Sequence, residues 1–568
     1  MSRETRAAAR PYSDDAMHPR TFEPAMLVVL VVVSILGSII GIQILTSLGV
    51  TPNTAIIGVL IAIAISRIPL EVFRRFRSIH RQNLVQSNIS AATFVAANSL
   101  LLPIAVPYVM GRPGLVWPML IGAGAAAVID FLMLYWMFDS RVFPAKEAWP
   151  PGIAAAEAIK AGDEGGKRAG LLGVGTLVGL LGSYIGIPMS AFGVAFIGNI
   201  VALTMFGVGL LIRGYGRGIT QAIGWGGGKG IDINALYIPH GVMIGAGVIA
   251  LAQAISVVVG RRKAGASVST PQQVPVPVAA GAHSEASAAD ADELTRDPSF
   301  VQKALVRGAV LYVLAGVVLA LASGIYSQMS IPRLIGWVVW AAFSCIAAEF
   351  IVGLSAMHSG WFPAFATALI FLTLGMFMGF PPIALALLVG FIAAGGPAFA
   401  DAGYDFKAGW LLRRGRSREM ELDGRREQLL AALVGMVVAF GVVALAYPMF
   451  FTNNQFPPVA KVFATTISAG ANPAILGNLA LWAIPGALIQ LVGGAKRQMG
   501  ILLATGLLIL NPLAGWAVLA GIVIRVLYRH FAKDKERADT DMTIVAAGFI
   551  AGDALWSFGS SMYKIAVK

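Results

Sequence analysis

Long apolar stretches recur along almost the whole chain, and polar residues, glycines and prolines interrupt many of them. A helix needs about 20 predominantly apolar residues to cross the hydrocarbon core of a bilayer. Lipid cannot satisfy a free backbone N–H or C=O group, so irregular backbone at membrane depth must line a cavity enclosed by protein. Hydrophobic residues make up 57% of the 568 residues and charged residues only 12%, which excludes a soluble domain. These features predict an all-α polytopic membrane protein and favour a role in moving a solute across a membrane.

The apolar pattern predicts about 14–16 transmembrane helices in two related halves, with broken or re-entrant helices among them. A polar segment rich in Ala, Ser and Pro separates the halves and is typical of a disordered linker. The expected organisation is a cytoplasmic N-terminal tail at 1–24, a first transmembrane half at 25–260, a disordered cytoplasmic linker at 261–300 and a second transmembrane half at 301–568. The apolar stretches lie at about 25–48, 54–70, 84–109, 115–138, 169–187, 190–212, 236–259, 303–326, 333–356, 361–380, 382–400, 429–450, 473–493, 500–528 and 543–560.

Arginine residues crowd two of the polar segments between apolar stretches, one of them directly after 382–400. Cytoplasmic loops of membrane proteins carry such an excess of Lys and Arg, which explains the net charge of +13 without a nucleic-acid partner. The same rule places the N-terminus and the linker in the cytoplasm. An even number of crossings must then precede the linker, although seven are obvious. The eighth is expected in a broken or re-entrant segment at 145–165 or 213–235.

Two short segments in different halves have similar sequences. Trp149-Pro150-Pro151 leads into an Ala-rich run that ends in Ala-Gly, and Phe456-Pro457-Pro458 leads into a similar run with nearly the same spacing. Interrupted segments at corresponding positions of two halves often mark the binding site of a transporter. The alternative is a chance similarity between two turns that each contain a Pro-Pro pair.

Six segments, taken in chain order, are similar to motifs of one family. They are RQNLVQSNISAATFVAANS (81–99), AWPPGIAAAEAIKAG (148–162), ALYIPHGVMIGAG (235–247), AAEFIVGLSAMHSGWFPAFA (347–366), DAGYDFKAGWLL (401–412) and TIVAAGFIAGDAL (543–555). This ordered set resembles the oligopeptide transporter (OPT) family, including its yellow stripe-like metal-chelate branch. Tyr404 and Phe406 replace Gln and Leu of a family signature, and Asp553 stands where Glu is common. The chain therefore resembles a divergent bacterial-type member.

The resemblance implies a secondary active transporter that couples proton symport to the movement of short peptides or peptide-like metal chelates. It places the chain in the bacterial cytoplasmic membrane and is compatible with a homodimer. A transporter of another organic solute is the first alternative. A membrane-embedded enzyme or a channel is a further alternative, but the sequence has no HExxH or GxSxG motif and no repeated filter motif. No enzymatic activity and no cofactor are expected.

Polar residues within the apolar stretches are the candidates for substrate binding. Gln86 and Ser90 share one stripe of a helix, and amide or hydroxyl groups suit peptide bonds or carboxylates. The alternative is hydrogen bonding between packed helices, worth about 0.6 kcal/mol per contact. No cluster of His, Cys or Asp has the spacing of a metal site, so no bound metal is expected. The proposed substrate-binding residues are Gln86, Asn88, Ser90, Asn98, Trp225, Asn234, His240, Ser355 and His358.

Ionisable residues within the apolar stretches are the candidates for proton coupling. A carboxyl group enclosed in a low-dielectric environment can exchange protons near neutral pH. Glu349 lies deep in its stretch and is the first candidate, and structural pairing is the alternative role. Asp405 and Lys407 are expected in a loop at the cytoplasmic mouth, either as a gating ion pair or as a solvated pair of little energetic weight. The proposed proton-coupling residues are Glu349, Glu157, Asp130 and Asp553.

Overall fold

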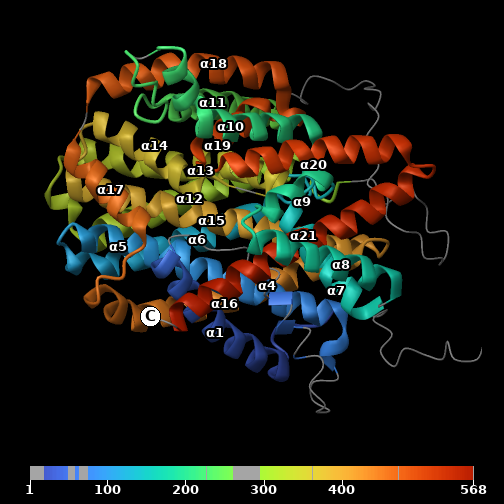
Figure 1. Ribbon diagram of the computed structural model, residues 1–568. Helices are drawn as coiled ribbons and strands as arrows, with labels where there is room; N and C mark the ends of the chain where they lie inside the picture. The colour runs from blue at the N-terminus through green and yellow to red at the C-terminus, as the bar shows by residue number, and fades with distance from the viewer. Residues whose placement is uncertain are drawn as a thin grey trace, which may run out of the picture.

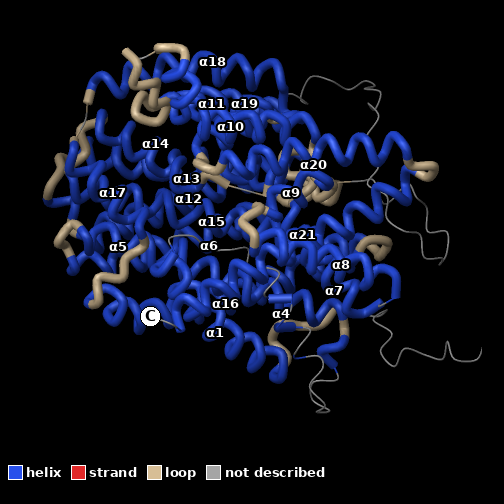
Figure 2. The backbone as a smooth tube through the Cα atoms, viewed as in Figure 1, coloured by secondary structure: helices blue, strands red, loops and turns tan. Residues whose placement is uncertain are grey.

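The computed structural model describes residues 18–48, 75–164, 166–225, 227–259, 294–360, 362–470 and 472–566, with positions 58, 59, 61, 62 and 65. These residues form helices joined by loops and turns, and none of them forms a strand (Figures 1 and 2). The predicted all-α fold is therefore confirmed. The helices are α1 (Pro24–Leu48), α4 (Ile79–Phe94), α5 (Leu102–Val109), α6 (Val116–Met137), α7 (Pro150–Glu164), α8 (Gly166–Tyr184), α9 (Met189–Ile197), α10 (Ile200–Ala222), α11 (Ile238–Val259), α12 (Pro298–Ser323), α13 (Ile331–Ser359), α14 (Ala364–Phe377), α15 (Pro382–Arg413), α16 (Arg418–Thr452), α17 (Pro458–Ala469), α18 (Pro473–Arg497), α19 (Met499–Leu508), α20 (Pro512–Phe531) and α21 (Lys535–Ala566).

Ten helical spans in the described part of the chain are long and apolar enough to cross a membrane. Four shorter apolar helices accompany them: Ala169–Tyr184, Ile238–Ala250, Ala364–Phe377 and Met499–Leu508. One span runs from Ile79 to Val109, and its middle, Val95–Leu101, is a π-helical stretch between α4 and α5. These spans confirm a polytopic membrane protein. The predicted linker lies mostly outside the described residues.

The helices pack as two bundles, defined here by their contacts. The first bundle contains α1, α4–α6 and α12–α17, with α15 at its centre against α4, α6, α7, α13 and α14. The second bundle contains α8–α11 and α18–α21. In Figure 1, α18, α11, α10 and α19 form the upper part of the molecule, and α1, α4 and α16 form the lower part. Helix α13 of the first bundle contacts α10, α11 and α19 of the second, and α12 and α14 also contact α11.

The second bundle has an internal two-fold pattern. Helix α8 packs on α21 as α18 packs on α11, and α9 packs on α20 and α21 as α19 packs on α10 and α11. Helices α8, α9, α10 and α11 therefore correspond in order to α18, α19, α20 and α21 in these contacts. The short helices α9 and α19 each precede a break, after which Asn199 caps α10 and Asn511 caps α20 through backbone N–H groups. This correspondence supports the prediction of two related halves.

Glycines allow the helices of the second bundle to cross closely. An added Cβ at Gly179 of α8 would lie 2.5 Å from the backbone oxygen of Phe549 in α21, and at Gly245 of α11 it would lie 1.8 Å from that of Ala483 in α18. Small residues at such crossings drive helix association in membranes, where lipid removes the hydrophobic driving force. The two related helix pairs are therefore packed backbone against backbone.

The two segments with similar Pro-Pro motifs form the short helices α7 and α17. Each precedes four helices of the second bundle, which agrees with the internal repeat. Helix α7 packs on α15 of the first bundle and on α8 and α21 of the second. It therefore connects the two bundles, whereas α17 packs on α5, α14 and α15 of the first bundle.

The segment before α1 is held against the first bundle by polar contacts. Thr21 N–H donates to Glu427 Oε2 at 2.7 Å, and Arg20 contacts Asp423 and Glu427 at 2.7 and 3.0 Å. His18 is buried, and its ring centroid lies 5.2 Å from that of His80. Burial, together with the Arg413 guanidinium, lowers the pKa of His18 to about 2. The docked segment therefore requires a neutral histidine.

Acidification should release this segment. The docked His18 stays neutral, whereas the undocked histidine gains a proton below its ordinary value of 6.5, so docking weakens as pH falls from 6.5 towards 2. Between pH 7.5 and 5.5 the loss is about 1.4 kcal/mol, or roughly tenfold in the docking equilibrium. A nitroxide on a Phe22→Cys variant, at an exposed position, should become more mobile at pH 5.5. The response should disappear with His18→Gln, and an equal response in that variant would contradict the role of His18.

Candidate functional site

Helices α4 and α15 meet along a buried polar seam. Gln86 Nε2 donates to Asp405 Oδ1 at 2.5 Å, and Ser90 Oγ donates to Asp401 Oδ1 at 2.7 Å. Both donors and both acceptors are four residues apart, so each pair occupies one face of its helix. All four side chains are at most 1% exposed. The polar stripe predicted around Gln86 and Ser90 therefore faces another helix that carries two carboxyl groups.

The other two candidates of this span have different environments. Asn88 Nδ2 donates to the Ala431 carbonyl at 2.8 Å, and its Oδ1 accepts from Ser34 Oγ at 2.8 Å. Asn88 thus joins α4 to α1 and α16. This is the alternative to substrate binding, in which a polar residue hydrogen-bonds between packed helices. Asn98 is buried in the π-helical stretch Val95–Leu101.

A second polar group joins three helices of the first bundle. The Tyr312 hydroxyl of α12 is hydrogen-bonded to Asp130 of α6 and to Glu349 of α13. We call these three residues the tyrosine–carboxyl triad, and all are at most 1% exposed. A phenol has one proton to donate, so it cannot donate to both carboxylates. One of the two carboxyl groups must therefore carry a proton and donate it to the Tyr312 oxygen.

Space for the Asp130 side chain depends on α15. An added Cβ at Gly395 would lie 1.8 Å from Asp130 Oδ2, so a glycine is required there. That oxygen and Glu349 Oε2 have no hydrogen-bond partner among the described residues. No ion pair found in the described part of the chain joins a Lys or Arg to either carboxyl group. Within the described residues, the triad thus has free acceptor capacity and no ion pair with a Lys or Arg.

The C-terminal end of α13 lies where several broken helices meet. Ser355 Oγ is 3.1 Å from Thr505 Oγ1 of α19, and the Met357 carbonyl accepts from Trp149 N–H at 2.8 Å, just before α7. His358 is 1% exposed, and neither ring nitrogen has a hydrogen-bond partner among the described residues. Its nearest acidic atom is Glu147 Oε2, at 3.7 Å. Ser355 and His358 therefore lie at the contact between the two bundles.

Asp405 and Lys407 do not lie in a loop, because α15 continues to Arg413 and both are buried within it. Residues two apart on a helix point to nearly opposite sides, since 3.6 residues make one turn. Asp405 accordingly faces α4, whereas Lys407 Nζ donates to the carbonyls of Ala145 and Glu147 at 2.7 and 2.8 Å. The expected gating ion pair and the solvated loop pair are therefore both wrong as structural descriptions. Lys407 instead holds the segment before α7.

The remaining ionisable candidates have identifiable structural partners. Asp553 accepts from Ser183 Oγ at 2.5 Å and from Ser190 N–H at 3.0 Å, so it caps the start of α9 from α21. Glu157 is buried in α7, with Lys160 Nζ at 3.6 Å from its Oε1. Glu157 is therefore not a solvated residue on the surface of a helix.

Three substrate-binding candidates lie on or beside the connection between α10 and α11. Trp225 is 61% exposed in the turn after α10, and Asn234 is exposed in a turn closed by Asp232, which accepts from its N–H. His240 is buried at the start of α11, where its ring centroid lies 5.3 Å from that of Tyr237. This connection thus supplies surface residues and one buried histidine.

A model of the OPT oligopeptide transporter protein family matches residues 23–249 and 228–564, which together include nearly the whole chain. The chain belongs to the OPT oligopeptide transporter family. It is therefore a multi-pass membrane transporter. No curated protein matches its sequence.

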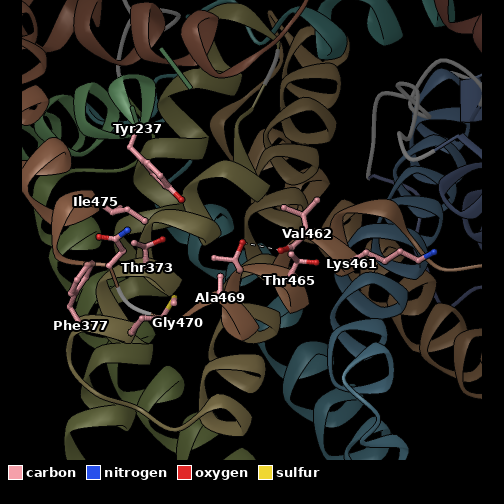
Figure 3. A pocket seen from close by; sticks show the side chains of 12 residues that line it. Tyr237, Thr373, Phe377, Lys461, Val462, Thr465, Ala469, Gly470 and Ile475 are labelled. Atoms are coloured by element: carbon pink, nitrogen blue, oxygen red, sulfur yellow. Dashed lines mark hydrogen bonds between the residues drawn. The ribbon is translucent and has the colours of Figure 1, made fainter. Parts of the chain in front are cut away.

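The transporter also has a pocket of about 410 Å³ between α14, α17, the start of α18 and the turn before α11. In Figure 3, Tyr237 and Thr373 lie on one side, Val462 and Thr465 lie on the other, and Lys461 extends away from Tyr237. None of the proposed substrate-binding residues lines it. Hydroxyl groups on the short helix α17 give it a polar wall that the sequence analysis missed.

Two further residues were not identified from the sequence, Tyr312 of the tyrosine–carboxyl triad and Asp401 of the seam between α4 and α15. Tyr312 lies in a smoothly apolar stretch, and only its contact with two acids distinguishes it. Asp401 begins the segment DAGYDFKAGWLL, and its position four residues before Asp405 places both carboxyl groups on one face of a helix, which is the sequence signal for this pair. Among the described residues, no group of three or more His, Cys, Asp or Glu side chains could hold a metal ion.

Proposed function

We propose that this transporter is a proton-coupled symporter of short peptides or peptide-like metal chelates in the bacterial cytoplasmic membrane, with its N-terminus in the cytoplasm. The observation that carries the proposal is the position of α13. Its residue Glu349 belongs to the tyrosine–carboxyl triad, and Ser355 and His358 of the same helix lie at the contact between the bundles. Six residues of helix span about 9 Å. One rigid element therefore links a protonatable group to the interface.

The triad supports proton coupling because its protonation state has structural consequences. With one carboxyl proton in addition to the phenol proton of Tyr312, two hydrogen bonds join the helices that carry Asp130, Tyr312 and Glu349. Loss of that proton leaves two buried carboxylates without a cation, which costs several kcal/mol. Proton release should therefore favour a rearrangement of α13 relative to α6 and α12.

The interface between the bundles supports a substrate path. Ligand sites of secondary transporters typically lie where discontinuous helices meet near the bilayer midplane. Here the end of α13, the start of α7 and the break between α9 and α10 lie close together, since an added Cβ at Gly198 would be 2.8 Å from the His358 carbonyl. The two ring nitrogens of His358, which have no hydrogen-bond partner among the described residues, and the nearby hydroxyl groups suit the amide and carboxylate groups of peptides.

Purified transporter in proteoliposomes tests this proposal. Pools of short peptides and ferric chelates should each be offered under an acid-outside pH gradient, with a collapsed gradient as the control. Saturable uptake of one pool that depends on the gradient is the expected result. Gradient-dependent uptake of a different organic solute would retain proton coupling and overturn the substrate class, whereas uptake that is equal without the gradient would overturn the coupling.

A further inference from the structure

The acidic pair Asp401–Asp405 of α15 is separate from the triad. Its two carboxyl groups face α4, and one oxygen of each is held by Ser90 or Gln86. The triad instead lies among α6, α12 and α13. The proton-coupling mechanism proposed above does not use this pair, although both side chains are at most 1% exposed.

Unpaired oxygens gather along this seam. Asp401 Oδ2 and Asp405 Oδ2 have no hydrogen-bond partner among the described residues. Asn83 is 0% exposed, and its Oδ1 is also without a partner there. The amide group of Asn83 faces the same chain of side chains, because its Nδ2 donates to Gln86 Oε1 at 3.0 Å. A buried acceptor without a donor is costly, so three along one seam indicate that a bound species completes the site.

The nearby cations Lys407 and Arg413 form their hydrogen bonds and ion pairs with groups other than the two carboxyl groups. Lys407 points away from the pair and donates to two carbonyls beside α7. Arg413 pairs with Glu421 at 2.8 Å, and its Nη2 donates to Gln428, whose Nε2 donates to the Asp405 carbonyl at 2.7 Å. Its Nη1 has no hydrogen-bond partner among the described residues, and it forms no ion pair with Asp401 or Asp405 there. No ion pair found within the described residues joins a Lys or Arg to Asp401 or Asp405. Two enclosed carboxylates therefore lack the positive charge that burial demands.

We infer that Asp401 and Asp405 bind a small monovalent cation, a proton or a sodium ion, with Ser90, Gln86 and Asn83 completing the site. Oxygen ligands are those that hard cations prefer. Calcium takes six to eight oxygens and magnesium keeps several waters, so a closed seam with three unpaired oxygens suits a smaller charge and fewer ligands. The inference rests on the assignment of an ion-coupled transporter, and it adds a second ion site to the triad.

Ion binding to the purified full-length transporter in nanodiscs tests this inference. The melting temperature is measured while sodium chloride replaces choline chloride at constant ionic strength and pH 7.5. A second series lowers the pH without sodium. A ligand that binds only the folded state raises the melting temperature in a saturable manner. We expect saturable stabilisation in one of the two series, and that series identifies the ion as sodium or a proton.

Matched variants connect the response to the site. Asp401→Asn and Asp405→Asn should each reduce the apparent affinity at least tenfold, whereas Asp553→Asn, which changes a carboxyl group with donors on both oxygens, should retain it. If the Asp variants fail to fold, Ser90→Ala keeps both carboxyl groups and should still weaken binding severalfold. An unchanged response in these variants or no response to either ion would overturn the inference.

This experiment is independent of substrate transport. It needs no transported solute, so a transporter that moves none of the tested peptides can still bind the ion. Conversely, Glu349→Gln should remove gradient-driven uptake and leave the ion-dependent melting shift within twofold of the parent protein. Failure of the proposed function and failure of this inference therefore give different results.

Discussion

Replacing Glu349 by Gln should abolish gradient-driven accumulation of substrate and leave exchange of substrate across the membrane largely intact. Glutamine retains the size of the side chain and can hydrogen-bond to Tyr312, but it cannot release a proton. The loaded carrier can then reorient while the proton gradient can no longer drive it. A gradient of one pH unit supports about tenfold accumulation, since each unit is worth about 1.4 kcal/mol. Accumulation in this variant should fall to the level reached without a gradient.

The other two members of the triad provide the comparison. Asp130→Asn should also uncouple transport, because Asp130 and Glu349 share the same phenol. Tyr312→Phe keeps both carboxyl groups and removes the hydroxyl between them, so it should shift the pH dependence of uptake while the protein still accumulates substrate. Uptake driven by a pH gradient and exchange at equal pH are measured on the same vesicles, with Asp553→Asn as the control. Gradient-driven accumulation by Glu349→Gln at the parental level would refute the assignment.

Periodicity predicted which faces of the polar span would be used, but not what those faces contact. Gln86 and Ser90 do share one face, as the spacing indicates, and both contact α15. Asn88 lies two residues from each, so it faces α1 and α16 instead. Polarity alone gave Asn88 and Gln86 the same candidate role. The two residues differ in the helix that each contacts. The partner of Gln86 is Asp405, which is more than 300 residues away in the sequence.

The expectation of a loop at Asp405 and Lys407 was wrong, because it rested on the charge of this segment. Lys407 and the arginines after it suggested a cytoplasmic loop under the positive-inside rule. Helix α15 is enclosed by other helices over most of its length. A buried lysine is tolerated there because backbone carbonyl groups accept hydrogen bonds from its ammonium group. The triad illustrates the same limit, because Asp130, Tyr312 and Glu349 come from three helices and no local pattern brings them together. Buried polar partners depend on tertiary packing, whereas helix count and polytopic topology depend on hydropathy.

The docking of α7 on α15 should be highly sensitive to a single added methyl group. Gly403 of α15 lies under the Trp149 ring, and an added Cβ would be 1.9 Å from Trp149 Cζ3. Trp149 is 0% exposed and has a backbone φ of 41°, in the left-handed region, at the entry to α7. Because Gly152 of α7 also approaches the Tyr404 carbonyl too closely for a Cβ, the helix cannot slide to make room. Gly403→Ala must therefore displace the ring.

We expect Gly403→Ala to lower the melting temperature by several degrees and to reduce transport at least tenfold. Overpacking a buried site costs about 1–3 kcal/mol, which exceeds the gain of about 1 kcal/mol for replacing Gly by Ala within a helix. Transport should fall further than stability alone requires, because α7 connects the two bundles. The matched control is Gly336→Ala in α13, where an added Cβ has no neighbour within 4 Å and the same substitution should be neutral or stabilising. Equal melting temperatures and equal transport in the two variants would show that α7 is not tightly docked on α15.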